Sequence, residues 1–514
     1  MSFFDPLGVN AGAGNRLGTL AFAGTKWGDA SFGSRYPEKV DYHLFAPRLG
    51  VAYSLSSKTV ARAGYGIFYS DAKYPGWGMG VATAGFDANP LFSSTLGGFQ
   101  AASILSQGFP QNFTKPPFIN GSFLNGQAGP LYRPFDANHI PYSQQWDLTI
   151  EHQFTNNFYV STAYAGNKGT HLYSRNDAPN ALNPSLLSMG NKLYDQFGPN
   201  DTEVDGVPAP YPGWAQQMTS CAPSVAQALL PYPQYCGGMV GINENEGNSE
   251  FESLQLKAEK RASNGVYLLA SYTFSKLITS VDSTQPDSEL GGTAGAFSPF
   301  QRQRNKSIAA EDIPQTLAVA FIYQLPFGRG KRWIGGANGF LRRLVDGWET
   351  SGVFHVSSAP PFFFRSSSCN VPAQFEAACV PAILPGAHPF AQSTSHFDPN
   401  KPLFDVAAFQ NPANTNGFSF YLGQGPRVSN LRAFPYHNLD FALVKRTPIT
   451  ERVNFEFRSE FFNFFNWHIF QTQGQVFGPN SSAFTTDVAS PTFGMWNGSV
   501  TRPRNIQVSG RINF

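Results

Sequence analysis

The chain has 514 residues, of which 14% are charged and 15% are aromatic, with 48 Phe and 50 Gly. Its formal net charge of +2 and the lack of any Lys/Arg block argue against a nucleic-acid partner. Soluble domains carry about 25% charged residues, so this composition indicates contact with lipid. However, a mean hydropathy of −0.24, with no apolar run near the roughly 18 residues that a spanning helix needs, argues against membrane helices.

A transmembrane β-barrel reconciles these observations, because only every second residue of each strand faces lipid. We therefore predict an all-β fold, an antiparallel transmembrane β-barrel of the outer-membrane type. Residues 1–40 are interpreted as an extended or loop lead-in, and 41–514 as the barrel portion. The opening sequence MSFFDPLGVNAGAGNR lacks the basic start and apolar core of a secretory signal. Since the outer membrane requires export, we expect a signal upstream of Met1.

Strict alternation of apolar and polar residues marks the strands. In 145–154 and 453–461 one face is apolar and the other carries charges, and 505–514 alternates without an exception. Most segments approach the 9–11 residues that a tilted strand needs to cross the hydrocarbon. In chain order the predicted strands are 46–54, 59–69, 145–154, 157–165, 253–259, 266–275, 316–324, 348–357, 437–446, 453–461 and 505–514.

The connections between these strands alternate between short and long. The long ones are 70–141, 166–251, 276–315, 358–436 and 462–504. Transmembrane barrels have short periplasmic turns and longer extracellular loops, so this rhythm predicts one membrane orientation. Bacterial barrels close with an even number of strands, so the odd count of about eleven indicates an incomplete barrel, which we expect to have about 11–12 strands in this chain.

The four cysteines form two close pairs, each within one long connection. Cys221 is close to Cys236, and Cys369 is close to Cys379, without the C-x-x-C spacing of zinc or redox sites. Disulfides formed in an oxidising compartment are the favoured interpretation, and four unrelated buried thiols are the alternative.

Several segments, spread over most of the chain, resemble the TonB-dependent outer-membrane receptors, in particular the Oar-like group whose barrel follows a carboxypeptidase-regulatory-like domain. They are FAPRLGVAYSLSSKTVARAGYGIFY (45–69), YVSTAYAGNKGTHLY (159–173), SLQLKAEKRASNGVYLLASYTFSK (253–276), LPFGRGKRW (325–333), NLDFALVKRTPITERVNFEFRSEFFNFFN (438–466) and the C-terminal strand. The resemblance implies a complete barrel of about 22 strands, an internal plug and a TonB-contacting segment. No counterpart of the plug, the regulatory-like domain or the TonB box is recognisable here, so the chain corresponds to the C-terminal part of such a barrel.

Polar residues on the charged strand faces are candidates for a water-filled lumen, where they would contact the plug or line the solute route. The alternative is that a hydrated lumen requires polar residues and pairs their charges locally. Phe514, at the end of the alternating C-terminal segment, is the candidate signal for barrel assembly. The lumen candidates are Asp147, Glu151, Lys257, Glu259, Glu456, Arg458 and Glu460.

Other motifs carry little chemistry. The acidic stretch 243–252 has oxygen ligands for a hard cation but lacks EF-hand spacing, so a solvated loop is favoured. The sequence FGRGKR (327–332) departs from a phosphate loop and is interpreted as a turn. The nine histidines form no metal motif, and no G-x-S-x-G elbow is present. We therefore expect no metal, no cofactor and no enzymatic activity.

The sequence thus predicts a protein of the bacterial outer membrane. Energised uptake of an unknown extracellular solute is the leading hypothesis, with TonB acting only through a plug that this chain lacks. A passive channel and a surface-binding or adhesion barrel are the alternatives. Outer-membrane lipid and the barrel-assembly machinery are the other expected partners.

Overall fold

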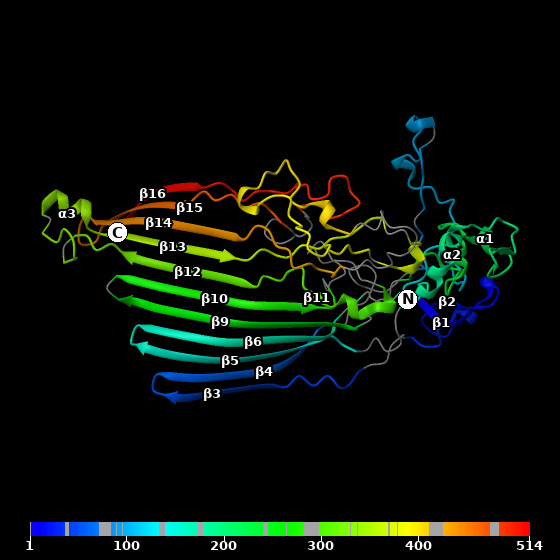
Figure 1. Ribbon diagram of the computed structural model, residues 1–514, viewed down its shortest axis with the longest axis horizontal. Helices are drawn as coiled ribbons and strands as arrows, with labels where there is room; N and C mark the ends of the chain where they lie inside the picture. Colours follow the sequence, from blue (N-terminus) through cyan, green and yellow to red (C-terminus); the bar gives the residue numbers. More distant parts are fainter. Residues whose placement is uncertain are drawn as a thin grey trace.

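One large antiparallel β-sheet dominates the molecule (Figure 1). The computed structural model describes the chain except for residues 1, 36–40, 71–83, 89, 95, 133–138, 173, 175–177, 240–244, 264, 282–297, 329, 337, 369–370, 378, 411–424 and 473–482. The strands of the sheet are β3 (Arg48–Ser56), β4 (Thr59–Tyr69), β5 (Tyr142–Thr155), β6 (Phe158–Leu172), β9 (Gly247–Ser263), β10 (Val266–Thr279), β12 (Gln315–Gln324), β13 (Trp348–Ser357), β14 (Tyr436–Pro448), β15 (Asn454–Phe462) and β16 (Asn505–Asn513).

Every strand predicted from alternation is present, and each pairs with its neighbours in chain order. The short strand β11 (Ser307–Ile308) adds to β10, which makes a 12-stranded sheet with β3 and β16 at its two edges. The predicted fold class, an antiparallel sheet of the outer-membrane barrel type, is confirmed. The sheet is open, because no pairing joins β3 to β16 among the described residues.

Four central strands are longer than predicted. β5 and β10 have 14 residues, β6 has 15 and β9 has 17. About 9–11 residues suffice to cross the hydrocarbon, so these strands extend beyond it. Most of their extra residues lie toward the long connections, where alternation is no longer imposed by lipid.

The two ends of the sheet differ, as the loop rhythm predicted. Short turns join β3 to β4, β5 to β6, β9 to β10 and β14 to β15 at one end, and the long connections all leave from the other (Figure 1). Gly347, just before β13, has φ +77, and a Cβ there would lie 2.1 Å from the carbonyl oxygen of Arg446. Glycine is therefore required where this turn passes the neighbouring strand.

The two faces of the sheet have opposite character. Apolar side chains such as Leu148, Leu256, Phe274 and Val508 lie on one face and remain exposed. Directly opposite residues of antiparallel strands share a face, so the strand register extends this apolar surface from β3 to β16. No helix in the described part of the chain is long and apolar enough to cross a membrane.

The clusters of buried hydrophobic residues lie in the long connections and the first 30 residues, and not in the large sheet. One cluster includes Leu182, Trp214 and Phe375, and a second is rich in phenylalanine, including Phe362 and Phe404. The apolar face of the sheet is exposed and its other face is polar, so the large clusters of buried apolar side chains form outside the sheet. Their short elements are β7 (Glu203–Val204), β8 (Val207–Pro208), α1 (Trp214–Gln217), α2 (Val225–Ala228) and the 3-10 turns η4 (Leu96–Gly98), η5 (Leu105–Gln107), η6 (Pro184–Tyr194), η7 (Pro299–Asn305), η8 (Ala373–Phe375), η9 (Thr394–His396) and η10 (Val406–Ala408). A third helix, α3 (Gly339–Val345), lies at the short-turn end.

The first 40 residues differ from the predicted lead-in. They contain a hairpin of β1 (Ser2–Asn10) and β2 (Arg16–Phe22), with the 3-10 turns η1 (Ala11–Ala13) and η2 (Gly28–Ala30). Its register shifts between Asp5 and Val9, so period two is broken within the hairpin. Phe4 and Leu20 are fully buried, and their backbone amides donate to Leu131 and Gly121 of the next long connection. Tertiary packing that no local pattern encodes therefore defines this hairpin.

Candidate functional site

The seven polar residues singled out from the sequence all lie on one face of the sheet. Glu151 is opposite Ser161, and Ser161 is opposite Lys257. The same register continues through β10, β12, β13 and β14 to Glu460 on β15. Alternation within each strand places Asp147, Glu259, Glu456 and Arg458 on this face as well. We call it the polar face.

Charges on the polar face are paired with one another across β13, β14 and β15. Arg446 contacts Glu456 (Nε to Oε2, 3.0 Å) and Glu349 (Nη1 to Oε2, 3.3 Å). Arg458 contacts Glu460 (Nη1 to Oε1, 3.1 Å) and Glu456 (Nε to Oε1, 3.7 Å). Acids and guanidinium groups therefore alternate along one row, which is the arrangement of a hydrated surface with balanced charge.

The β4 to β9 part of the polar face follows the same rule. Lys257 lies 3.8 Å from Glu259 (Nζ to Oε2), and Arg62 lies 3.4 Å from Glu151 (Nε to Oε2). Asp147 has no ion pair within the described residues, and its side chain lies over Gly64, where a Cβ would be 2.5 Å from Oδ1. Local pairing was the alternative interpretation of these residues, and it describes six of the seven.

The long connections form a cap at the other end of the sheet, and one disulfide lies within it. Cys221 and Cys236, which are 15 positions apart in the sequence, are joined with a Cα–Cα distance of 5.8 Å. Cys379 is also disulfide-bonded. Cys369 lies outside the described residues, so its predicted pairing with Cys379 stays a prediction.

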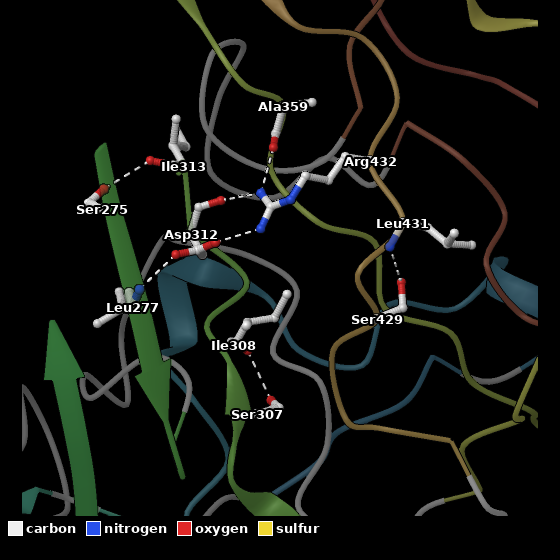
Figure 2. A network of polar contacts seen from close by, with 10 residues as sticks. All are labelled: Ser275, Leu277, Ser307, Ile308, Asp312, Ile313, Ala359, Ser429, Leu431 and Arg432. Atoms are coloured by element: carbon white, nitrogen blue, oxygen red, sulfur yellow. Dashed lines mark hydrogen bonds and ion pairs between the residues drawn. The ribbon is translucent and has the colours of Figure 1, made fainter. Parts of the chain in front are cut away.

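A buried ion pair fixes the cap to the end of the sheet (Figure 2). Arg432 Nη2 donates to Asp312 Oδ2 at 2.5 Å, and Arg432 Nη1 donates to the carbonyl oxygen of Ala359 at 2.6 Å. The other carboxylate oxygen of Asp312 accepts from the backbone amide of Leu277 on β10 at 2.7 Å. Two connections distant in sequence are thereby held against one strand.

Arg427 makes a second contact of this kind. Arg427 is only 2% exposed, and its guanidinium group donates to the carbonyl oxygens of Asn305 (2.7 Å) and Thr279 (3.0 Å). Sequence reasoning missed Arg427, Arg432 and Asp312. A single charged residue in a long loop has no periodicity to distinguish a buried contact from a solvated one.

Glu376 and Asp487 are among the carboxyl groups of the cap that have shifted pKa values. Burial raises the pKa of Glu376, although a hydrogen bond from the backbone of Gly238 acts in the opposite direction. Burial also acts to raise the pKa of Asp487, but hydrogen bonds from Ser367 and Ala489 outweigh it and hold that pKa below its usual range. Both groups link different parts of the cap.

The sequence favoured a solvated loop for the acidic stretch 243–252, but part of this stretch belongs to a strand. Residues from Gly247 onward belong to β9, and Glu246 forms an ion pair with Arg302; residues 243–244 lie outside the described part of the chain. A cavity of about 380 Å³ adjoins them, and its walls include Lys168, Glu250 and Lys306. Its walls thus carry both signs of charge. Within the described residues no group of three or more His, Cys, Asp or Glu side chains is placed to hold a metal ion.

Phe514 follows the last residue of β16 and is 99% exposed. It continues the parity of Ile512, whose side chain is on the apolar face. The C-terminal segment is therefore an edge strand, and Phe514 lies beyond its last paired residue, Asn513.

Comparison with known proteins agrees with this architecture. A family model described as "Outer membrane beta barrel domain" matches residues 1–507. No curated protein sequence matches the chain.

The solved structures similar to this chain include two receptors and one transporter from bacteria. The ferripyoverdine receptor of Pseudomonas aeruginosa has 10% identity and a TM-score of 0.34, over 91% of this chain and 32% of that one. The outer membrane transporter YddB from Escherichia coli has 8% identity and a TM-score of 0.36, over 91% and 40%. The ferric yersiniabactin uptake receptor FyuA from Yersinia pestis has 10% identity and a TM-score of 0.33, over 91% and 37%. The chain thus spans less than half the length of each, and similarity at this level transfers no ligand.

Proposed function

Because this chain belongs to the family of outer membrane β-barrel domains and lies in the outer membrane, we propose that it is the C-terminal part of the barrel of a TonB-dependent receptor. Residues 41–514 supply the barrel portion, and the Oar-like group is the proposed relative. The complete protein takes up an extracellular solute when TonB acts on a plug encoded upstream. Its role is transport and not catalysis.

The asymmetry between the two ends of the sheet carries this proposal. One end has mostly short turns, whereas the other bears the packed cap with its disulfide and the Arg432–Asp312 ion pair. A simple pore needs only an open mouth, but a receptor needs ordered loops that hold a ligand before it enters. Cross-linked and buried loop packing supports the receptor.

The open sheet supports the incomplete barrel. β3 and β16 are edge strands, and an unpaired backbone group in hydrocarbon costs several kcal/mol. β3 starts at the cap end and β16 finishes at the short-turn end, so the number of strands from β3 to β16 is odd when the two-residue β11 is left out. Bacterial barrels close with an even number of strands. Further strands between β3 and β16 satisfy both requirements.

The polar face supplies the proposed lumen. Its paired charges keep a wall hydrated without presenting one sign of charge to a solute. It also gives a plug many hydrogen-bonding partners, including Asp147, a carboxylate with no ion pair in the described part of the chain.

The experiment compares the receptor with the passive channel. The whole protein, with whatever its gene encodes upstream of Met1, is purified and inserted into a planar bilayer in KCl, and its binding to a purified C-terminal domain of TonB is measured. A receptor gives no steady conductance and binds the TonB domain, because a plug fills the lumen. Steady ohmic conductance without TonB binding would overturn the proposal in favour of a passive channel.

A further inference from the structure

The connection between β12 and β13 is unlike the other turns at the short-turn end, since it contains the helix α3 (Figure 1). No residue of α3 is buried. Phe340 is 77% exposed, Leu341 is 52% exposed and Leu344 is 48% exposed. The same connection exposes half of Trp333. A surface of this kind on a protein indicates a partner.

The helix is amphipathic. Phe340 and Leu344 are four residues apart, and Leu341 and Leu344 are three apart, so these side chains form one apolar stripe. Arg342 and Arg343 lie beside the stripe. A short helix with an apolar stripe flanked by cations is typical of elements that lie in a membrane interface.

The position of α3 is fixed from the apolar face of the sheet. Trp348 and Lys445 are directly opposite each other on that face. Trp348 Nε1 donates to the carbonyl oxygen of Leu344 at 2.8 Å, and Lys445 Nζ donates to those of Arg343 (2.7 Å) and Asp346 (2.8 Å). Two side chains of the lipid-contacting face thus hold the C-terminal end of α3. The helix therefore continues that face beyond the strand ends.

The charge of this connection indicates which partner contacts its exposed apolar surface. The described part of the connection carries Lys331, Arg332, Arg342 and Arg343 against the acidic residue Asp346, which pairs with Arg342 (Nε to Oδ2, 3.5 Å). Guanidinium groups bind phosphate oxygens strongly, and apolar side chains beside them enter the acyl region. Short turns of outer-membrane barrels face the periplasm.

We propose that α3, together with Lys331, Arg332 and Trp333, forms an interfacial anchor, with the apolar stripe of α3 in the periplasmic leaflet and its arginines on the phosphates of anionic phospholipid. The anchor would fix the depth of the sheet at β12 and β13. It rests on the outer-membrane location of the chain and is independent of the transport function.

The test reconstitutes the whole protein into vesicles of phosphatidylcholine, with or without 30 mol% phosphatidylglycerol. Leu341→Cys carries an environment-sensitive fluorophore, and brominated lipids act as quenchers. We expect quenching in both kinds of vesicle. The quenching should be about twofold stronger with phosphatidylglycerol, and salt should abolish this difference. An unquenched probe in both vesicles would overturn the anchor and indicate a protein partner.

Matched variants separate charge from folding. Arg342→Gln with Arg343→Gln should abolish the dependence on phosphatidylglycerol, while Arg452→Gln, in the exposed β14–β15 turn at the same end, should preserve it. Equal dependence in all three proteins would contradict the role of the α3 arginines.

Discussion

At the scale of single residues, Arg432 and Asp312 decide how the cap is attached. Asp312 is 3% exposed, and its carboxylate accepts from both Arg432 and the backbone of Leu277. Removing one partner of such a pair leaves an uncompensated buried charge, which is far more costly than the pair itself is stabilising.

Arg432→Met should therefore destabilise the attachment of the cap by about 3–5 kcal/mol. Limited proteolysis of the protein in membranes should show faster cleavage in the 358–435 connection, with the membrane-embedded strands intact. Arg452→Met, in an exposed short turn, is the control. Equal cleavage rates for both variants would show that the ion pair does not hold the cap.

The cysteines allow a second prediction at this scale. Peptide mapping without reduction should recover the Cys221–Cys236 link and, in the same digest, a Cys369–Cys379 link. The location in an oxidising compartment is the physical reason. Free thiols at all four positions would contradict both the pairing and the compartment.

Residues of the polar face were predictable, whereas those of the cap were not. Period two gives the face of Glu456 or Lys257 without any knowledge of partners. Arg427 and Asp312 follow no period, and their burial depends on segments more than a hundred residues away. The paired charges on the polar face also needed the register between strands.

At the scale of elements, the strands were predictable because lipid imposes alternation on each of them. Their ends were not, since β6 and β9 continue beyond the hydrocarbon into the cap. The β1–β2 hairpin was missed because its register shift breaks the pattern and its packing is tertiary.

Adjacent positions on β12 test the assignment of the two faces. Val319 is opposite Ala270 on the apolar face, and Ala318 is opposite Ser271 on the polar face. Val319→Arg should destabilise the membrane-embedded protein by about 2–4 kcal/mol, and Ala318→Arg by less than about 1 kcal/mol. Unfolding by urea in vesicles measures the loss of stability in both variants. A larger loss for Ala318→Arg than for Val319→Arg would show that the lipid-contacting and lumen-facing sides of the sheet are assigned the wrong way round.

The final strand has a test of its own. Phe514→Ser should impair assembly, because the proposed role of this exposed aromatic residue is recognition by the barrel-assembly machinery. Heat-modifiable migration of the folded form, measured on membrane fractions, reports assembly. Asn513→Ser is the neighbouring control. Wild-type migration of both variants would show that Phe514 is not the assembly signal.

At the scale of the whole molecule, the chain separates its tasks along the membrane normal. The short-turn end carries the proposed anchor, the middle presents one apolar and one polar face, and the far end buries its core in the cap. The Oar-like resemblance and the incomplete barrel stay predictions, because an open sheet can be completed by strands of different origins.

The opposition of the two faces is the central claim, and scanning cysteine substitutions along β10 tests it most directly. Leu269, Ser271 and Thr273 lie on the polar face, and Leu268, Ala270 and Tyr272 on the apolar face. In outer membranes, a water-soluble maleimide should label only the first set, and lipid-phase quenchers should act only on probes of the second. Labelling without a period of two along β10 would contradict the account.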